Sequence, residues 1–181
     1  MRARGERSVM VLEEARDSVS CLDVRGHEIV AGSVDGRVRT YDLAMGVVDV
    51  DVLGASVTSV EFASEGEGYL ASTLDNGARF MERGTGKCLQ RFEAEGFVNE
   101  GLRLRSGFAM GGANVVAGSE DGSVFVWDVL SGEVTAKLSH REGERSTGKK
   151  DAVSAVAWNQ ARKQWASAGG DGTVVVWGQG G

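Results

Sequence analysis

The sequence predicts an all-β protein built from about four copies of one unit, each made of four antiparallel strands. Three observations predict this fold class. A twelve-residue run, clearest at 117–128, recurs three more times along the chain. Apolar and polar residues alternate on either side of a central Asp-Gly or Asp-Asn-Gly turn, which is the pattern of a β-hairpin. The chain also holds 27 glycines and no proline, so glycine forms the turns.

The copies are spaced like blades of a propeller. They span 31–42, 71–82, 117–128 and 167–178. Their turn aspartates are Asp35, Asp75, Asp121 and Asp171, about 40, 46 and 50 residues apart. A period of about 40–45 residues that closes on an aromatic residue and an acid is typical of a WD-repeat β-propeller. The second copy has Met81 in place of the aromatic residue, which indicates a degenerate blade.

Further alternating segments complete each predicted blade. The predicted inner strands are 19–24, 57–62, 97–104 and 153–158, of which 97–104 is the least regular. The predicted outer strands are 47–53, 87–92 and 133–138, and their polar character suits an exposed sheet edge. The last copy has no outer strand after it. Residues 8–12 have the pattern of an outer strand without inner strands, as if to complete the last blade of a ring.

These segments divide the chain. We treat 1–181 as a single propeller unit with an outer strand at 7–15 and four blades, at 17–54, 55–94, 95–140 and 151–181.

Composition limits the class of partner. The formal net charge is −6, which argues against a non-specific nucleic-acid surface. No stretch approaches the 18 apolar residues of a membrane span. Cys21 and Cys88 lie in different copies, so we expect free thiols and a reducing compartment, the cytoplasm or the nucleus.

One polar set in the last copy has two interpretations. In WD repeats that this copy resembles, the residues at Asp171, His140, Ser167 and Trp177 form one hydrogen-bond network. The indole N–H of Trp177 is expected to bond Ser167, Ser167 to bond His140, and Asp171 to hold the other ring nitrogen. A Ser-His-Asp hydrolase is the alternative, but Ser167 lacks the Gly-x-Ser-x-Gly elbow that such a site needs. The other copies have alanine in place of this serine.

Neither a cofactor nor a metal is expected. Residues 143–150 nearly match a phosphate-binding loop, but Lys150 stands where a hydroxyl should bind magnesium and a strand follows. The two histidines and two cysteines show no paired spacing, and His27 is interpreted as a surface turn residue.

Several segments carry a closer resemblance. Residues 12–20 and 27–46 resemble the fifth-blade region of the mitogen-activated protein kinase organiser family, and the similarity continues through 72–75, 99–103 and 119–128. That family consists of seven-bladed WD-repeat scaffolds, and this chain corresponds to their C-terminal four blades, with an expanded loop at 139–151. The resemblance implies a non-catalytic scaffold for kinase-cascade components. The alternative is a structural subunit of a spliceosome-type ribonucleoprotein, involved in pre-mRNA splicing.

Partner contacts are expected on the loops that enter the inner strands. The candidate residues are Arg16, Asp17, Asn99, Glu100, Arg103 and Asp151. The partners are other proteins, with no direct nucleic acid and no membrane. An open arc of four blades exposes apolar faces. We therefore expect a part of a longer protein, a closed four-bladed ring, or self-association of two copies.

Overall fold

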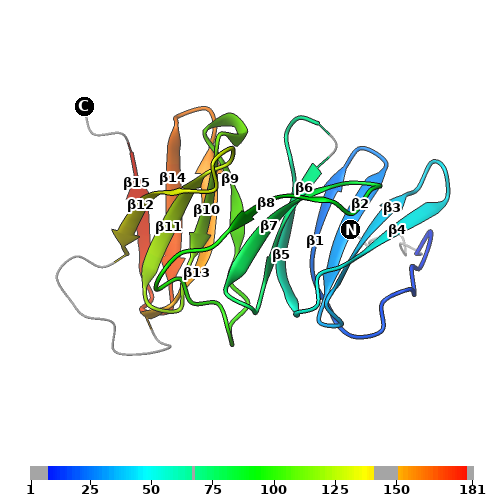
Figure 1. The fold of residues 1–181 in the computed structure, drawn as a ribbon, viewed down its shortest axis with the longest axis horizontal. Coiled ribbons are helices and arrows are strands. Elements are labelled where there is room, and N and C mark those ends of the chain that lie inside the picture. Colours follow the sequence, from blue (N-terminus) through cyan, green and yellow to red (C-terminus); the bar gives the residue numbers. More distant parts are fainter. Residues whose placement is uncertain (1–7, 67, 141–150, 179–181) are drawn as a thin grey trace, which may run out of the picture.

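The computed structural model describes residues 8–66, 68–140 and 151–178. Within these residues the chain forms four antiparallel sheets, three of four strands and one of three (Figure 1). Each sheet is a simple meander, in which every strand pairs with the next along the chain.

The sheets follow one another along the chain as blades 1 to 4. Blade 1 consists of β1 (Val19–Arg25), β2 (Glu28–Ser33), β3 (Arg37–Asp42) and β4 (Val47–Val52). Blade 2 consists of β5 (Val57–Phe62), β6 (Gly68–Thr73), β7 (Gly77–Glu82) and β8 (Cys88–Phe92). Blade 3 consists of β9 (Ser106–Ala109), the 3-10 turn η1 (Met110–Gly112), β10 (Asn114–Gly118), β11 (Ser123–Asp128) and β12 (Val134–Ser139). Blade 4 consists of β13 (Val153–Asn159), β14 (Gln164–Gly169) and β15 (Val174–Trp177).

The recurring run folds as the central hairpin of each blade. In blade 3 the turn between β10 and β11 needs a positive φ, which Gly122 supplies at 85°. In blade 2 the same conformation falls on Asn76, at 60°, because asparagine stands there at the position that is glycine in the other turns, and asparagine tolerates a positive φ. The degenerate copy therefore still makes its hairpin.

Apolar side chains are buried between successive blades. Val30 and Val38 of blade 1 pack against Val57 and Tyr69 of blade 2. The largest cluster lies between blades 2 and 3 and includes Phe92, Phe97, Phe125 and Trp127. Among the described residues, the cluster between blades 3 and 4 has four buried members, Ala109, Val116, Val124 and Val153. The last junction is therefore the least filled.

The inner strand of blade 3 differs from the sequence prediction. It is Ser106–Ala109, and residues 97–104 form an irregular segment. A carboxylate oxygen of Glu120 accepts hydrogen bonds from the backbone N–H groups of residues 100, 101 and 102, at 2.8, 2.6 and 2.9 Å. These N–H groups are thus satisfied by a side chain instead of a neighbouring strand.

The predicted outer strand at 7–15 is not seen among the described residues, since 8–15 form no strand. Met10 and Leu12 lie instead beside Tyr41 and Val48 of blade 1. The side chain of Glu14 is hydrogen-bonded to Tyr41, and burial together with this bond raises the pKa of the tyrosine.

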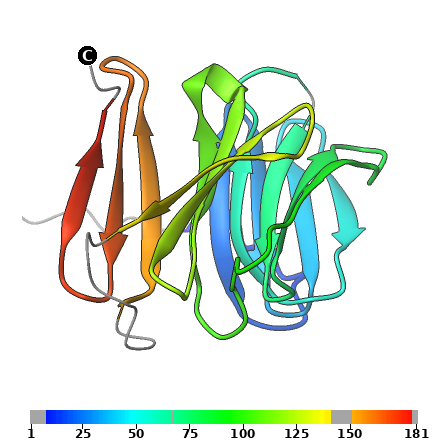
Figure 2. The ribbon, with the colours of Figure 1, turned by 60° about the vertical axis from the view of Figure 1, so that its left-hand side comes forward.

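The four blades form an arc with blades 1 and 4 at its two ends (Figures 1 and 2). Both end blades expose apolar side chains: Leu22 and Val24 on β1 are 63% and 57% exposed, and Val174 and Val176 on β15 are 68% and 67% exposed. Among the described residues, no helix is long and apolar enough to cross a membrane.

Candidate interaction surface

The candidate residues lie along one edge of the arc. This edge, the lower one in Figure 1, holds the turns with the four aspartates and the loops that enter the inner strands; we call it the aspartate edge. Backbone bonds join each loop to its turn, for example from Val34 N to Ser18 O at 3.0 Å and from Glu120 N to Val98 O at 2.8 Å. Such pairing fixes the loops on the sheets below them.

Most of the predicted contact residues are accessible there. Arg16, Asp17, Glu100 and Arg103 are exposed, and Asp151 is half-buried. The backbone N–H of Arg16 donates to Asp35 at 3.0 Å, so the loop is held while the arginine side chain faces solvent.

Asn99 has a different role from the predicted one. Its side chain is 1% exposed. Its Nδ2 donates to Thr58 Oγ1 at 3.3 Å and to the carbonyl oxygen of Thr73 at 3.1 Å, and its backbone N–H donates to Asn76. Asn99 therefore joins the loop to blade 2 and cannot contact a partner.

Ion pairs with arginine hold the aspartates of blades 1 and 2. The guanidinium of Arg39 donates to both carboxylate oxygens of Asp35, at 3.3 and 2.7 Å, and both side chains are more than nine-tenths buried. The hydrogen bond from Arg39 is the main reason that the pKa of Asp35 lies well below its ordinary value. The guanidinium of Arg79 likewise donates to both carboxylate oxygens of Asp75. Burial raises the pKa of Asp75, but the bonds from Arg79 and Thr73 outweigh it and lower the pKa overall.

These arginines were not predicted. In both copies an arginine stands four residues after the aspartate, and this repeated spacing was the available signal. The same position of the run, its ninth, is Phe125 in blade 3 and Val175 in blade 4, so the aspartates of those blades have other partners.

In blade 3 the cation comes from the outer strand. Lys137 lies opposite Phe125 in the β11–β12 ladder. Its ammonium lies 3.2 Å from Asp121 Oδ2 and 4.7 Å from the ring centroid of Phe125. This pair is about half-exposed, unlike the one in blade 1.

In blade 4 the four predicted residues meet, together with one that was not predicted. Trp177 Nε1 donates to Ser167 Oγ at 2.8 Å, and Ser167 Oγ lies 2.8 Å from His140 Nδ1. His140 Nε2 lies 3.0 Å from Thr173 Oγ1, and Thr173 Oγ1 lies 2.9 Å from Asp171 Oδ1. The carboxylate itself is 3.8 Å from the ring, so Thr173 stands between them.

The direction of these hydrogen bonds follows from Asp171, whose ionised carboxylate can only accept. Thr173 donates to it, so His140 Nε2–H donates to Thr173, and in the neutral imidazole Nδ1 then accepts the proton of the Ser167 hydroxyl. Gly169 makes room for the ring, because a Cβ there would lie 2.9 Å from His140. Ser167 is 1% exposed, and its hydroxyl is hydrogen-bonded to both Trp177 and His140. A buried and bonded hydroxyl argues against the hydrolase interpretation. Residues 143–150, the near-match to a phosphate loop, lie outside the described residues.

His27 lies in a small group that could hold a metal ion. Its ligand atoms and those of Glu28 and Asp42 lie within 4.8 Å of one another. Glu28, however, is already paired with Arg25 at 3.3 Å and with Arg83. The positive charges of these two guanidinium groups beside Glu28 disfavour binding of a metal cation there. His27 is an exposed turn residue, as predicted.

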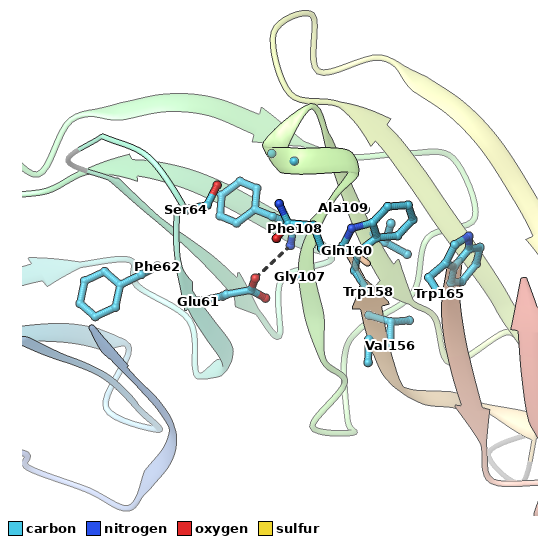
Figure 3. Close-up of a pocket in the computed structure, with 14 residues that line it drawn as sticks. Glu61, Phe62, Ser64, Gly107, Phe108, Ala109, Val156, Trp158, Gln160 and Trp165 are labelled. Carbon is cyan, nitrogen blue, oxygen red and sulfur yellow. Dashed lines mark hydrogen bonds between the residues drawn. The ribbon is translucent and has the colours of Figure 1, made fainter. Parts of the chain in front are cut away.

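A hollow lies on the opposite edge, where η1 and the turns after the inner strands gather (Figure 3). We call it the Glu61 pocket; its volume is about 260 Å³, and it is lined by β5, β9, η1, β13 and β14. Glu61 points toward Gly107 and Phe108 on β9, and Trp158 and Trp165 lie on the neighbouring strands. Burial, with a smaller contribution from the charge of Asp23, raises the pKa of Glu61 to about 7, despite a bond from the N–H of Phe108 at 3.4 Å. Gly107 leaves this space open, because a Cβ there would lie 2.6 Å from Glu61.

The repeated antiparallel sheets of three or four strands define the class of protein, which is a β-propeller. Its loops are held by hydrogen bonds to the hairpin turns of the sheets. The family model described as "WD domain, G-beta repeat" matches residues 6–42, 86–128 and 143–178, and the chain belongs to this WD40 family. The predicted fold class and the predicted resemblance are both confirmed. Proteins of this family generally act as protein-interaction scaffolds.

Individual relatives are similar over most of the chain. WD repeat domain-containing protein 83 of Rattus norvegicus is 41% identical over 137 residues, 76% of this chain and 43% of the relative. The Homo sapiens protein of the same name is 36% identical over 136 residues, 75% of this chain and 42% of the relative. The chain thus spans less than half the length of these curated relatives.

Two designed proteins share the fold. The computationally designed Ika4 protein superposes with a TM-score of 0.75 at 23% identity, covering 96% of this chain and 98% of Ika4. The designed Ika8 protein superposes with a TM-score of 0.72 at 24% identity, covering 92% of this chain and 47% of Ika8.

Proposed function

We propose that this chain is part of a non-catalytic scaffold that binds other proteins through the aspartate edge. One observation carries the proposal: the loops there are pinned by buried groups while charged side chains such as Arg16 and Arg103 stay exposed. Pinned loops lose little conformational entropy on binding, which favours recognition. The behaviour of the WD40 family supports the same function.

For the pathway, we propose the assembly of kinase-cascade components, in the cytoplasm or the nucleus. The support is the resemblance of residues 12–20 and 27–46 to the mitogen-activated protein kinase organiser family, together with the similarity to WD repeat domain-containing protein 83. The second candidate is a structural subunit of a spliceosome-type ribonucleoprotein. A net charge of −6 favours protein contacts over a direct grip on RNA in that setting.

The test is immunoprecipitation of the full-length native protein from its source cells, with mass spectrometry of everything bound. Kinases among the bound proteins support the first pathway, and splicing factors with nuclease-resistant small nuclear RNAs support the second.

A matched pair of variants tests the surface. Arg16→Glu reverses charge on the aspartate edge, at an exposed side chain of a residue that is held through its backbone N–H. Glu65→Lys reverses charge on the opposite edge. We expect the first variant to lose bound proteins and the second to keep them; retention of every partner by the first would reject this surface.

A further inference from the structure

The Glu61 pocket has the size of one side chain. Its volume of about 260 Å³ is below the range of about 300–1,000 Å³ that holds drug-sized ligands. A second hollow of about 360 Å³ shares Trp158 and Trp165 with it and extends between blades 3 and 4, toward β12. The space therefore suits one inserted side chain with the adjoining part of a peptide.

The pocket presents a single charge. Of the described residues that line it, Glu61 alone is charged, and the rest are apolar, aromatic or small, with Ser64 and Gln160 as the polar exceptions. Its carboxylate accepts only the long bond from Phe108. Arg103 and Arg105 line a hollow on the side of Glu61 toward β1, yet neither forms an ion pair with it in the described part of the chain. A half-buried carboxylate such as Glu61, without a cation beside it, is stabilised in its charged form by a cation from outside.

The neighbouring junction shows which cation fits such a place. Between blades 1 and 2, the guanidinium of Arg25 lies 4.6 Å from the ring centroid of Phe62 and donates to the carbonyl oxygens of Ala63 and Gly66, at 3.0 and 3.1 Å. Asp23 accepts there from the N–H of Phe62, as Glu61 does from the N–H of Phe108.

Blade 2 lacks its own copy of this arginine. Asp23-Val24-Arg25 of β1 corresponds to Glu61-Phe62-Ala63 of β5, so alanine stands where blade 1 has arginine. In the described residues no arginine lies over the rings of Phe108, Trp158 or Trp165, which remain partly exposed.

An unsatisfied donor indicates a peptide instead of a free cation. The indole Nε1 of Trp158 is buried and has no hydrogen-bond partner. A buried N–H needs an acceptor, and an arginine side chain has none. The backbone carbonyl groups of a bound peptide would supply that acceptor next to the guanidinium.

We propose that the Glu61 pocket binds an arginine side chain presented by a peptide segment of a partner protein. The guanidinium pairs with the Glu61 carboxylate and lies against the aromatic rings, and a peptide carbonyl accepts from Trp158. This inference rests on the proposed function as a protein-binding scaffold, but it concerns the edge opposite the one proposed above.

The test uses the 181-residue chain labelled with ¹⁵N and three capped amino acids: N-acetyl-arginine methylamide, its lysine counterpart and its citrulline counterpart. Citrulline keeps the shape of arginine without the charge. We expect the arginine compound to move the Trp158 indole resonance and to bind about tenfold or more tightly than citrulline, and more tightly than lysine. Glu61→Gln should weaken arginine binding by a similar factor, while Glu65→Gln, on the exposed β5–β6 turn, should leave it unchanged.

A pH titration separates the role of Glu61 from a loss of folding. Because the pKa of Glu61 is raised to about 7, arginine should bind about tenfold more tightly at pH 8 than at pH 6. The charged groups sharing a hollow with Glu61 are Asp23, Arg103 and Arg105, so loss of the pH dependence in Glu61→Gln assigns the effect to Glu61.

Equal binding of citrulline and arginine, tighter binding of lysine, or an unmoved Trp158 resonance would each overturn the proposal. None of these outcomes affects the immunoprecipitation result for Arg16→Glu, because Arg16 is not among the described residues that line either hollow beside Glu61, so the two proposals fail independently.

Discussion

At the scale of single residues, the four turn aspartates occupy one position of the repeat but have different partners. Arg39 and Arg79 follow their aspartates by four residues, Lys137 reaches Asp121 from the next strand, and Thr173 connects Asp171 to His140. The aspartate itself was predictable from the repeat. Its partner depends on burial and on the neighbouring strand, which a motif does not encode.

This difference in burial predicts unequal costs of substitution. Arg39→Ala leaves the Asp35 carboxylate buried without its cation, and we expect it to lower the free energy of unfolding by about 3–5 kcal/mol at pH 7. Lys137→Ala breaks a pair that is 46% and 30% exposed, and we expect a loss of about 1 kcal/mol or less. Urea unfolding of both variants measures the contrast, and equal losses would contradict it.

The same pair predicts a pH dependence. The bond from Arg39 holds the folded pKa of Asp35 below the ordinary 3.8. Stability from ionised Asp35 is therefore present above about pH 3.8 and is lost as the pH falls through the folded pKa. We expect the stability difference between the wild-type chain and Arg39→Ala to be largest near neutrality and to shrink below pH 3.8. A difference that stays constant down to pH 2 would show that the pair does not set it.

Comparing substitutions of two tryptophans in blade 4 measures the contribution of one hydrogen bond to the free energy of unfolding. Trp177→Phe removes the N–H that donates to Ser167 at 2.8 Å, while Trp158→Phe removes an N–H without a partner. Both changes remove the same atoms, so Trp177→Phe should cost about 1 kcal/mol more in the free energy of unfolding. Thermal and urea unfolding of the two variants provide the comparison, and a costlier Trp158→Phe would exclude this role for the network.

At the scale of elements, the central hairpins were the predictable part, because Asp-Gly turns and alternation are local signals. The inner strand of blade 3 was misplaced since its position depends on Glu120, a residue close to 97–105 only in the folded chain. The Glu61 pocket was missed for a related reason: strands from three blades line it, and no local pattern brings them together.

Within the segment before β9, residues 100–102 should depend on the side chain of Glu120 for their order. Glu120→Ala removes the shared acceptor of three N–H groups, and we expect faster hydrogen exchange at residues 100–102 with a stability loss of about 1–2 kcal/mol. Glu95→Ala changes an exposed acid just before the same segment and serves as the control. Unchanged exchange at these three amides in Glu120→Ala would mean that other contacts order the segment.

At the scale of the whole molecule, the arc of four blades resembles both a whole chain of similar length and half of a longer chain. It matches nearly all of the designed Ika4 chain and about half of the designed Ika8 chain. In the arc described here, β1 and β15 expose apolar side chains that the inner blades bury against their neighbours. Exposed apolar faces of this kind promote association.

We therefore expect the 181-residue chain to self-associate through its end faces, with a sedimentation coefficient that rises with concentration. Leu22→Asp with Val24→Asp places two charges on the exposed face of β1 and should shift the chain toward monomer. Val9→Asp with Val11→Asp adds the same charge to side chains that are also exposed, 100% and 67%, but lie outside the sheets. If both variants dissociate equally, net charge is the cause; if the first alone becomes monomeric, the end face of blade 1 is the contact. A wild-type chain that stays monomeric at every concentration would contradict this expectation.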